Sequence, residues 1–303
     1  MGKMPHIMDL HQAIVGGDIG LVTKICQSGL DLGTPMRGTT ALSLAVYRGN
    51  LEAVRVLLSN GAPLDRRSKD HLDRIETPII SAIRLGHEDI FNQLVAHGAR
   101  LDVPDFYNQT PLWFAVKEQR LSFVRVLLQA GAPINFIRAS ENPLNLAVQF
   151  LGYRGRRELM IELIAAGLPL SLEDYKGQCP LYWAMKHADL EFFRLLIEAG
   201  AKVRRWEWLS PPNLPLNWQK QSEVMPWIAQ EQTTPPPLTR LARTAVRQQL
   251  SHLTNRDIRS TIIQLPLPTP LIRNLLLNDP IAKVNMTLMQ ISSGNEQQIR
   301  QLN

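Results

Sequence analysis

The residues that could perform chemistry are few in this chain, and their spacing does not assemble a reaction site. None of its seven histidines and two cysteines stands in a metal-ligand spacing with another. His87 precedes Glu88, but the pair follows Gly86 in an expected turn between two helices, which favours a structural role. Cys179 lies at an expected helix start, eight residues before His187, and the helix dipole there can lower a thiol pKa. This position is normally buried in the repeat described below, which disfavours a nucleophilic role. The chain also lacks a phosphate-binding glycine loop and a nucleophile elbow. We therefore predict a protein that is not an enzyme and holds no metal or cofactor.

Composition sets the class of protein and its expected compartment. The chain has 303 residues, of which 45% are hydrophobic, as in a folded protein. Its two cysteines, Cys26 and Cys179, are far apart and lie inside helical patterns, so we expect buried reduced thiols and a cytoplasmic or nuclear setting. No apolar run reaches the about 18 residues that a membrane span needs, and residues 1–6 lack the apolar core of a signal peptide. The net charge of +6 is mild and contains no long run of one sign, so neither nucleic acid nor membrane is predicted as a partner.

The helices that would position any binding residue come from a repeat. Similar segments recur at spacings of 37, 33, 32 and 37 residues, beginning at Thr40, Thr77, Thr110, Asn142 and Cys179. Each continues with Pro or Ala, then Leu or Ile, and later Ala. A second helical pattern follows and ends at a glycine, namely Gly61, Gly98, Gly131, Gly167 and Gly200 in turn. An earlier copy at residues 8–32 brings the number of units to six.

One unit can be explained from its residues. Thr caps the first helix, Pro starts it, and apolar residues at steps of three and four face the neighbouring unit. A tight turn reverses the chain, and a glycine supplies the left-handed conformation that ends the second helix. This pattern resembles the ankyrin repeat over residues 8 to about 205. The resemblance implies an all-α solenoid of about six repeats with short β-hairpin fingers and a concave binding surface. In that family Thr-Pro-Leu is followed by His, which is replaced here by Ser43, Ile80, Trp113, Asn145 and Tyr182.

Two units are longer than the rest, and both insertions are basic. The step from Gly61 to Thr77 is 16 residues where 11 or 12 is usual, and the step from Asn142 to Gly167 is 25 where 21 is usual. The first insertion places Arg66, Arg67, Lys69, His71 and Arg74 in a hairpin finger. The second is expected to place Tyr153, Arg154, Arg156 and Arg157 in a loop between helices. Because loops on a rigid scaffold often carry binding specificity, we predict contacts with an acidic target. Tolerated solvated insertions remain an equal alternative.

Residues 206–236 differ in composition from the repeats. They hold four of the six tryptophans and several prolines. Large aromatic side chains among prolines can cover the open end of a repeat array without continuing it. We therefore expect an end cap and a bridge to the C-terminal segment, in preference to a ligand site. Beyond residue 279 the chain turns polar, and the tail 279–303 is expected to be disordered.

Residues 237–277 have a spacing that points to one kind of partner. On a helix, one face is apolar and comprises Leu238, Leu241, Ala242, Ala245, Val246 and Leu250. The opposite face carries Arg240, Arg243 and Arg247, and we expect it to face water. Ile258, Ile262 and Ile263 indicate a second short helix. Two prolines force Leu265-Pro266-Leu267-Pro268 to run extended, and Thr269-Pro270 starts a third helix. So short a three-helix segment buries too little surface to be stable alone.

This segment, taken as 237–278, resembles a SOCS box. The match comprises Pro237, Leu238, Ala242 and Val246, followed by Leu265, Pro266, Leu267 and Pro268. The family usually has Cys where this chain has Ala242. The combination of the two motifs is similar to the ankyrin repeat and SOCS box family. The resemblance implies that Leu238, Leu241, Ala242 and Val246 contact elongin C, paired with elongin B, and that the Leu-Pro-Leu-Pro run contacts cullin-5 with its RING-box protein.

The organisation expected from the sequence is thus a repeat array (1–205), an end cap and linker (206–236), the box and the tail. The predicted function is that of an adaptor: the array captures a target protein, and the box docks it on a ubiquitin ligase. The alternative is an ankyrin scaffold that binds a partner without ubiquitin transfer. A plain helical C-terminal cap is the other interpretation of the box segment.

Overall fold

The computed structural model describes residues 6–69, 74–134, 142–149, 156–173, 176–204 and 206–276. The chain divides into two compact units, Met1–Pro133 and Ile134–Asn303. Of the residues singled out above, His71, Tyr153, Arg154 and the tail 279–303 lie outside the described residues.

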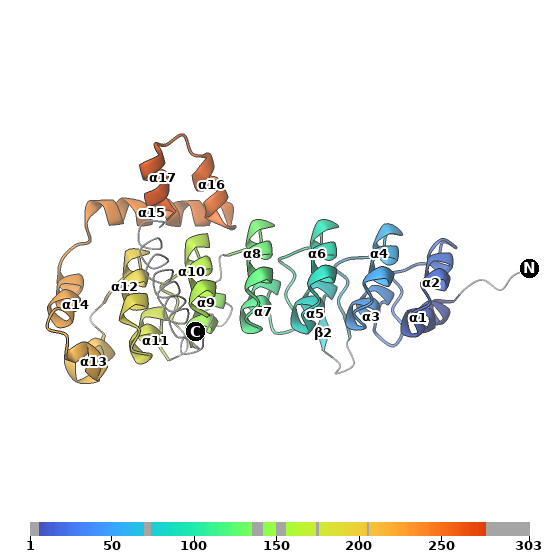
Figure 1. The fold of residues 1–303 in the computed structure, drawn as a ribbon, viewed down its shortest axis with the longest axis horizontal. Helices are drawn as coiled ribbons and strands as arrows, with labels where there is room; N and C mark the ends of the chain where they lie inside the picture. Colours follow the sequence, from blue (N-terminus) through green and yellow to red (C-terminus); the bar gives the residue numbers. More distant parts are fainter. Residues whose placement is uncertain are drawn as a thin grey trace, which may run out of the picture. The chain divides into compact units, whose positions relative to one another are not determined.

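The described part of unit 1 consists of four helix pairs, which follow one another along the chain (Figure 1). Its helices are α1 (Ile7–Gly16), α2 (Ile19–Cys26), α3 (Ala41–Tyr47), α4 (Leu51–Ser59), α5 (Pro78–Leu85), α6 (Glu88–Ala96), α7 (Pro111–Lys117) and α8 (Leu121–Gln129). The first helix of each pair packs on the first helix of the next, so α1, α3, α5 and α7 form one layer. The fully buried Phe91 of α6 and Phe123 of α8 join adjacent pairs in the second layer, with ring centroids 4.6 Å apart. Each pair therefore buries its apolar face only with its neighbours, as the repeat predicted.

The expected helix caps form in most units. The Thr40 and Thr110 hydroxyls accept hydrogen bonds from the amides of Ser43 and Trp113 at 3.2 and 3.3 Å. Thr77 differs, since its buried hydroxyl makes no cap bond in the described part of the chain. Proline at the first position of α5 supplies the helical φ there instead.

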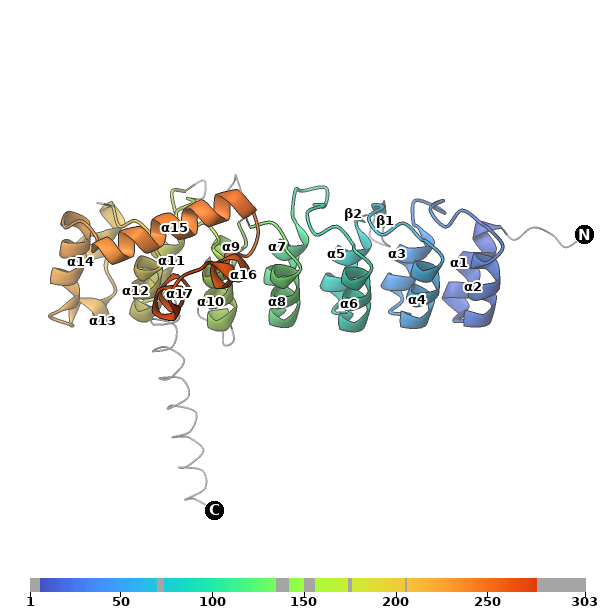
Figure 2. The ribbon, with the colours of Figure 1, turned by 90° about the horizontal axis from the view of Figure 1, so that it is seen from above.

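A two-stranded antiparallel hairpin, β1 (Ser68–Lys69) and β2 (Ile75–Glu76), forms the predicted finger. The register pairs Lys69 with Ile75 and Ser68 with Glu76. Figure 2 shows this hairpin and the loops on either side of it projecting from the same side of unit 1.

Unit 2 begins with two more helix pairs: α9 (Pro143–Gln149) with α10 (Arg156–Ala166), and α11 (Pro180–Lys186) with α12 (Leu190–Glu198). The six predicted pairs are therefore all present. One expectation was wrong: Arg156 and Arg157 lie in the first turn of α10 and not in a loop. Arg157 Nη2 binds Glu191 Oε2 at 2.8 Å and lies 3.8 Å from Asp189 Oδ1. These carboxylates at the start of α12 offset the charge of a cation at a helix N-terminus, where it would otherwise be disfavoured.

The tryptophan-rich segment packs against the last helix pair, as expected for an end cap. It contains two 3-10 turns, Glu207–Leu209 and Pro211–Asn213, then α13 (Leu216–Gln219) and α14 (Val224–Thr233). The Trp218 side chain is fully buried, and its Nε1 donates to the Ala188 carbonyl at 3.1 Å. Phe193 of α12 packs edge-on against Trp218, with ring centroids 5.1 Å apart.

The C-terminal segment forms the three predicted helices: α15 (Leu238–Thr254), α16 (Ile258–Gln264) and α17 (Thr269–Leu275). Leu265 and Pro268, with ψ of 139° and 142°, bound an extended connection between α16 and α17. Figure 1 shows α15 lying across the ends of α10 and α12, with α16 and α17 beside it.

Candidate protein-docking surfaces

The arginine face of α15 does not face water as expected. Its arginine face is buried: Arg243 and Arg247 are only 7% and 5% exposed. Its apolar face is turned outward, with Leu238 83% and Leu241 45% exposed. The prediction that the arginines face water was therefore wrong. The helical period correctly identified which residues share a face, but the arginine face is the one that packs against the repeats.

Free carbonyl groups at helix ends explain why the arginines face inward. Arg243 Nη2 donates to the Glu198 carbonyl at the end of α12 and lies 3.1 Å from Glu198 Oε2. Arg247 Nη2 donates to the carbonyls of Ile164 and Ala165 in the last turn of α10, at 2.8 and 2.9 Å. The last carbonyls of a helix have no partner within it and carry the negative end of its dipole. Two arginines four residues apart on α15 thus cap the last helices of two consecutive repeats.

Three further ion pairs fasten α15 and α16 to α14 and to the repeats. Arg240 contacts Glu231 of α14 at 2.6 Å and Glu198 at 3.2 Å. Arg259 of α16 contacts Glu162 of α10 at 2.6 Å. Burial lowers the pKa of Arg247 to about 10, so this side chain remains charged at neutral pH.

The glycines that end α10 and α12 provide the space for this docking. A Cβ at Gly167 would lie 2.9 Å from Ile258 Cδ1, and one at Gly200 would lie 2.7 Å from Thr244 Cγ2. At the corresponding Gly61 and Gly98 of unit 1, a Cβ would meet nothing within 4 Å. These glycines are therefore needed in unit 2 for close approach as well as for their positive φ.

The outward apolar face of α15 contains the residues that the SOCS-box resemblance assigns to elongin C. Ala242 and Val246 are exposed beside Leu238 and Leu241. Of the run assigned to the cullin, Pro266, Leu267 and Pro268 are exposed, and Leu265 is partly buried. Exposed large apolar residues also occur farther along α15 and on α16 and α17, at Leu253, Ile263 and Leu271. Several exposed large apolar residues on neighbouring helices are typical of a protein interaction site.

The predicted basic residues of the finger are exposed on the hairpin. Arg66, Arg67, Lys69 and Arg74 all lie at the surface of unit 1. Arg157 is less available to a target because Asp189 and Glu191 hold it. The exposed aromatic pair Phe106 and Tyr107, in the next finger, was not predicted from the sequence. The available signal was two adjacent aromatic residues inside a segment otherwise typical of a loop.

Other side chains replace the histidine that the ankyrin pattern usually carries. The Ser68 hydroxyl of the finger donates to the Ser43 hydroxyl of α3 at 2.5 Å. Asn145 Nδ2 of α9 donates to the Leu172 carbonyl, in the segment before the next repeat, at 3.0 Å. These bonds tie a helix to the following finger.

The described residues contain no group of three or more His, Cys, Asp and Glu side chains that could hold a metal ion. Cys26 and Cys179 are buried free thiols, and burial raises the pKa of both, which opposes a nucleophilic role. Among the helices that the structure describes, none is both long and apolar enough to span a bilayer.

Comparison with known proteins supports the repeats. The family model for ankyrin repeats (3 copies) matches residues 10–105 and 65–138. The chain is 29% identical over 205 residues to the Transient receptor potential cation channel subfamily A member 1 of Drosophila melanogaster, a match covering 64% of this chain and 17% of the channel. It is 26% identical over 215 residues to human Inversin, covering 69% of this chain and 19% of Inversin. The chain thus matches only about a fifth of the length of these relatives.

Solved structures agree on the fold. An ankyrin repeat domain from Acinetobacter baumannii superposes with a TM-score of 0.58 at 28% identity, covering 64% of this chain and 98% of that domain. The ankyrin repeat domain of Bcl-3 gives a TM-score of 0.53 at 24% identity, covering 64% of this chain and 87% of that one. The family model and the solved structures thus support ankyrin repeats in this chain.

Proposed function

We propose that this protein is a non-catalytic, substrate-recognition adaptor of a ubiquitin ligase built from elongin B, elongin C, cullin-5 and a RING-box protein. The observation that carries the proposal is the outward apolar face of α15. Leu238, Leu241 and Val246 are exposed there, on the helix whose spacing matches the elongin C motif. Burying such side chains in a partner removes apolar surface from water, which is a main favourable contribution to protein association.

The arginine face has a matching role in this proposal. Because Arg243 and Arg247 hold α15 against the ends of α10 and α12, its apolar face is left free for a partner. A plain helical cap would be expected to bury its leucines against the repeats and expose its arginines. The extended run from Leu265 to Pro268 follows on the same segment, and it is the proposed cullin-5 contact.

The contribution to ubiquitin transfer would be proximity. The ankyrin repeats bind the target, and the C-terminal helices bind the ligase, so target lysines reach a high effective concentration near the charged conjugating enzyme. The conjugating enzyme performs the bond chemistry, and this chain does none of it.

The decisive experiment is co-purification of the full chain with elongins B and C and cullin-5. Leu238→Asp is expected to abolish elongin binding because it places a charge on the most exposed leucine of the apolar face. Leu216→Asp is the matched control, since Leu216 on α13 is 73% exposed and lies outside the motif. The double variant Leu265→Ala/Pro266→Ala should retain the elongins and lose cullin-5.

The results separate this function from a scaffold role. If the wild-type chain co-purifies with neither elongins nor cullin-5, the adaptor proposal fails and a binding scaffold without ubiquitin transfer is favoured. Undiminished binding of both partners by the Leu238 and Leu265/Pro266 variants would reject the assignment of residues.

A further inference from the structure

The finger side of unit 1 carries two unusual exposed features next to each other along the chain. The first, here named the basic hairpin, consists of Arg66, Arg67, Lys69 and Arg74. The second, here named the aromatic fingertip, consists of Phe106 and Tyr107, which are 76% and 75% exposed. Figure 2 shows that the hairpin and the loop between α6 and α7 project on the same side of the helices.

The basic hairpin is held on a firm support. The Lys69 amide donates to the Gly38 carbonyl of the preceding finger at 2.9 Å, and the Thr39 hydroxyl donates to the Lys69 carbonyl at 2.7 Å. The Ser68 hydroxyl contacts Ser43 of α3. Lys69 also lies over Gly38, where an added Cβ would come within 3.1 Å of its Cδ. The backbone at Lys69 is thus held by the preceding finger, which lowers the entropy cost of binding at this position.

The aromatic fingertip is also built by local hydrogen bonds. Asp105 Oδ1 accepts from the amides of Tyr107 and Gln109, both at 2.9 Å. Asn108 adopts the left-handed conformation that completes the turn, with φ of 63°. The two rings meet edge to face, with centroids 5.5 Å apart. Large aromatic side chains held in the open by a rigid turn are typical of the residues that dominate binding energy in protein interfaces.

The two fingers are connected. The Arg100 amide, at the base of the aromatic fingertip's loop, donates to Asp65 Oδ1, directly before the basic hairpin, at 2.8 Å. A cavity of about 220 Å³ lies at the base of the hairpin, lined by residues that include Ser43, Tyr47, Arg48 and Lys69. This volume is below the roughly 300 Å³ of the smallest usual ligand pockets, so it suits a single side chain of a partner.

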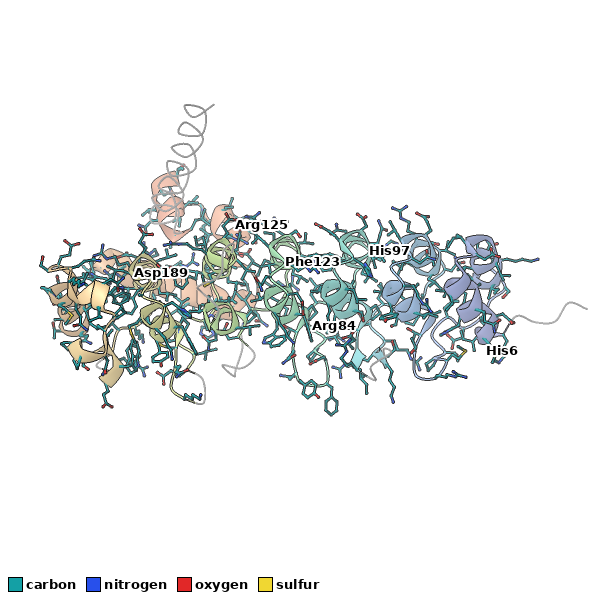
Figure 3. All side chains as sticks on the ribbon, turned by 60° about the horizontal axis from the view of Figure 1, so that its bottom comes forward. His6, Arg84, His97, Phe123, Arg125 and Asp189 are labelled. Atoms are coloured by element: carbon teal, nitrogen blue, oxygen red, sulfur yellow. The ribbon has the colours of Figure 1, made fainter. Side chains whose placement is uncertain are left out.

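Carboxylates on this side are engaged within the chain. Asp31 accepts from Gly33 and Thr34, and its pKa is lowered by those hydrogen bonds and by the charge of Arg66. Buried Glu76 is held by Ser81 and Arg84, and Figure 3 shows Arg84 toward the finger side, with His97 and Arg125 on the opposite side. Asp31 and Glu76 thus serve contacts within unit 1, and the four cations of the basic hairpin are exposed at its surface.

We infer that the finger side of unit 1 binds an acidic protein segment that carries at least one aromatic or aliphatic side chain. This inference rests on the target-binding role proposed above and specifies the chemistry of the target. The carboxylates of the segment pair with the basic hairpin, and its apolar side chain packs on Phe106 and Tyr107. A short acidic segment fits better than nucleic acid because Asp31, Asp65 and Asp102 interrupt the cations in sequence and leave no continuous basic run for a row of phosphates.

The test selects ligands from a library of random peptides displayed on phage, with the immobilised full chain as bait. The enriched peptides are expected to contain Asp and Glu together with Phe, Tyr, Trp or Leu. Their binding is then measured for Arg66→Glu/Arg67→Glu/Arg74→Glu and, separately, for Phe106→Ser/Tyr107→Ser. Each variant is expected to bind the peptides at least about tenfold more weakly than the wild type does. Added salt should weaken the pairing of acidic peptide residues with the basic hairpin and leave the packing on the aromatic fingertip unchanged.

A matched control reverses three exposed cations elsewhere in unit 1, as Lys24→Glu/Arg55→Glu/Arg125→Glu on α2, α4 and α8. This variant changes the net charge by the same amount and should retain peptide binding. Equal weakening by the control would show a general charge effect and overturn the inference. So would enriched peptides without acidic residues, no enriched peptides at all, or undiminished binding by the hairpin and fingertip variants.

A second arm tests the competing class of partner. A single-stranded oligonucleotide is titrated against the full chain. If the oligonucleotide binds more tightly than any selected peptide, and the Arg66/Arg67/Arg74 variant loses this binding, the surface is assigned to nucleic acid and the inference is overturned. Elongin binding is measured on the same variants and should be unchanged. If the peptides do not bind as expected but the elongins do, only this inference is overturned. If the wild-type chain does not bind the elongins, only the ligase role is overturned.

Discussion

Arg247 Nη1 donates a hydrogen bond to the Leu275 carbonyl at 2.5 Å, across 28 residues of sequence. The other terminal nitrogen of the same guanidinium serves Ile164 and Ala165. One side chain therefore joins the last turn of α17 to the last turn of α10. A planar group with several donors in a fixed fork suits this task, and lysine does not offer the same geometry.

The first prediction concerns this junction. Arg247→Met should lower the free energy of unfolding of the full chain by about 2–4 kcal/mol, because three buried carbonyls lose their donor. Urea unfolding followed by tryptophan fluorescence measures the loss, since four of the six tryptophans lie in residues 206–227 of unit 2. Arg256→Met is the control: Arg256 is exposed in the turn after α15, and its replacement should cost under about 0.5 kcal/mol. Equal effects of the two changes would mean that the Arg247 contacts contribute nothing net.

The second prediction concerns the close approach of α15 to Gly200. Gly200→Ala introduces a Cβ at φ of 108°, and 2.7 Å from Thr244, so it combines backbone strain with a clash. Gly61→Ala, at φ of 79° with nothing within 4 Å, carries the backbone strain alone. We expect Gly61→Ala to cost about 1–2 kcal/mol and Gly200→Ala clearly more.

The clash in unit 2 can be relieved to check its origin. Thr244→Ala removes the two atoms that lie nearest to the added Cβ. The double variant Gly200→Ala/Thr244→Ala should therefore be more stable than the sum of the single changes predicts, as measured in a double-mutant cycle. Strict additivity would indicate that α15 moves away from Gly200 without cost.

The repeats could be predicted from sequence because their signals are local. Each signal depends on contacts within one unit or between neighbouring units. These signals are the regular spacing of the glycines, the caps at Thr40 and Thr110, and the apolar residues at helical spacing. Thr77 lacks the cap bond, a difference that residue type alone does not reveal. The start of α10 at Arg156 was missed because a basic first turn is not a usual helix-start signal.

The orientation of α15 could not be predicted from its own residues. Helical spacing defined the two faces, but burial of the arginine face depends on free carbonyls at Glu198, Ile164 and Ala165, which are distant in sequence. The aromatic fingertip was missed for a similar reason, since Phe106 in a loop could equally have packed beneath it. Its exposure depends on the turn held by Asp105.

The third prediction compares a buried ion pair with an exposed one. Glu76 is buried and receives hydrogen bonds from Ser81 and Arg84, so Glu76→Ala leaves a nearly buried cation without its carboxylate. We expect a loss of about 3 kcal/mol in unfolding free energy. Asp102→Ala breaks the exposed pair with Arg100 and should cost under about 1 kcal/mol. In chemical denaturation the two variants should separate clearly, and similar losses would contradict this ranking.

The last prediction concerns pH. His11 of α1 is 3% exposed, and burial lowers its pKa below the ordinary 6.5. The unfolded chain therefore binds a proton at His11 more readily than the folded chain does. The stability that depends on neutral His11 is present above about pH 6.5 and is lost as the pH falls through the lower folded-state pKa. Burial, together with the nearby charge of Arg120, lowers the pKa of His87 as well, so both groups act in the same direction.

Thermal melting between pH 7 and pH 5 measures this effect. The melting temperature of the wild type should fall with pH, and His11→Leu should fall less steeply because its buried side chain cannot be protonated. His97→Leu provides the matched control, since His97 is exposed at the end of α6 and its replacement should leave the slope unchanged. A slope that is identical in wild type and His11→Leu would mean that other groups cause the loss at acid pH.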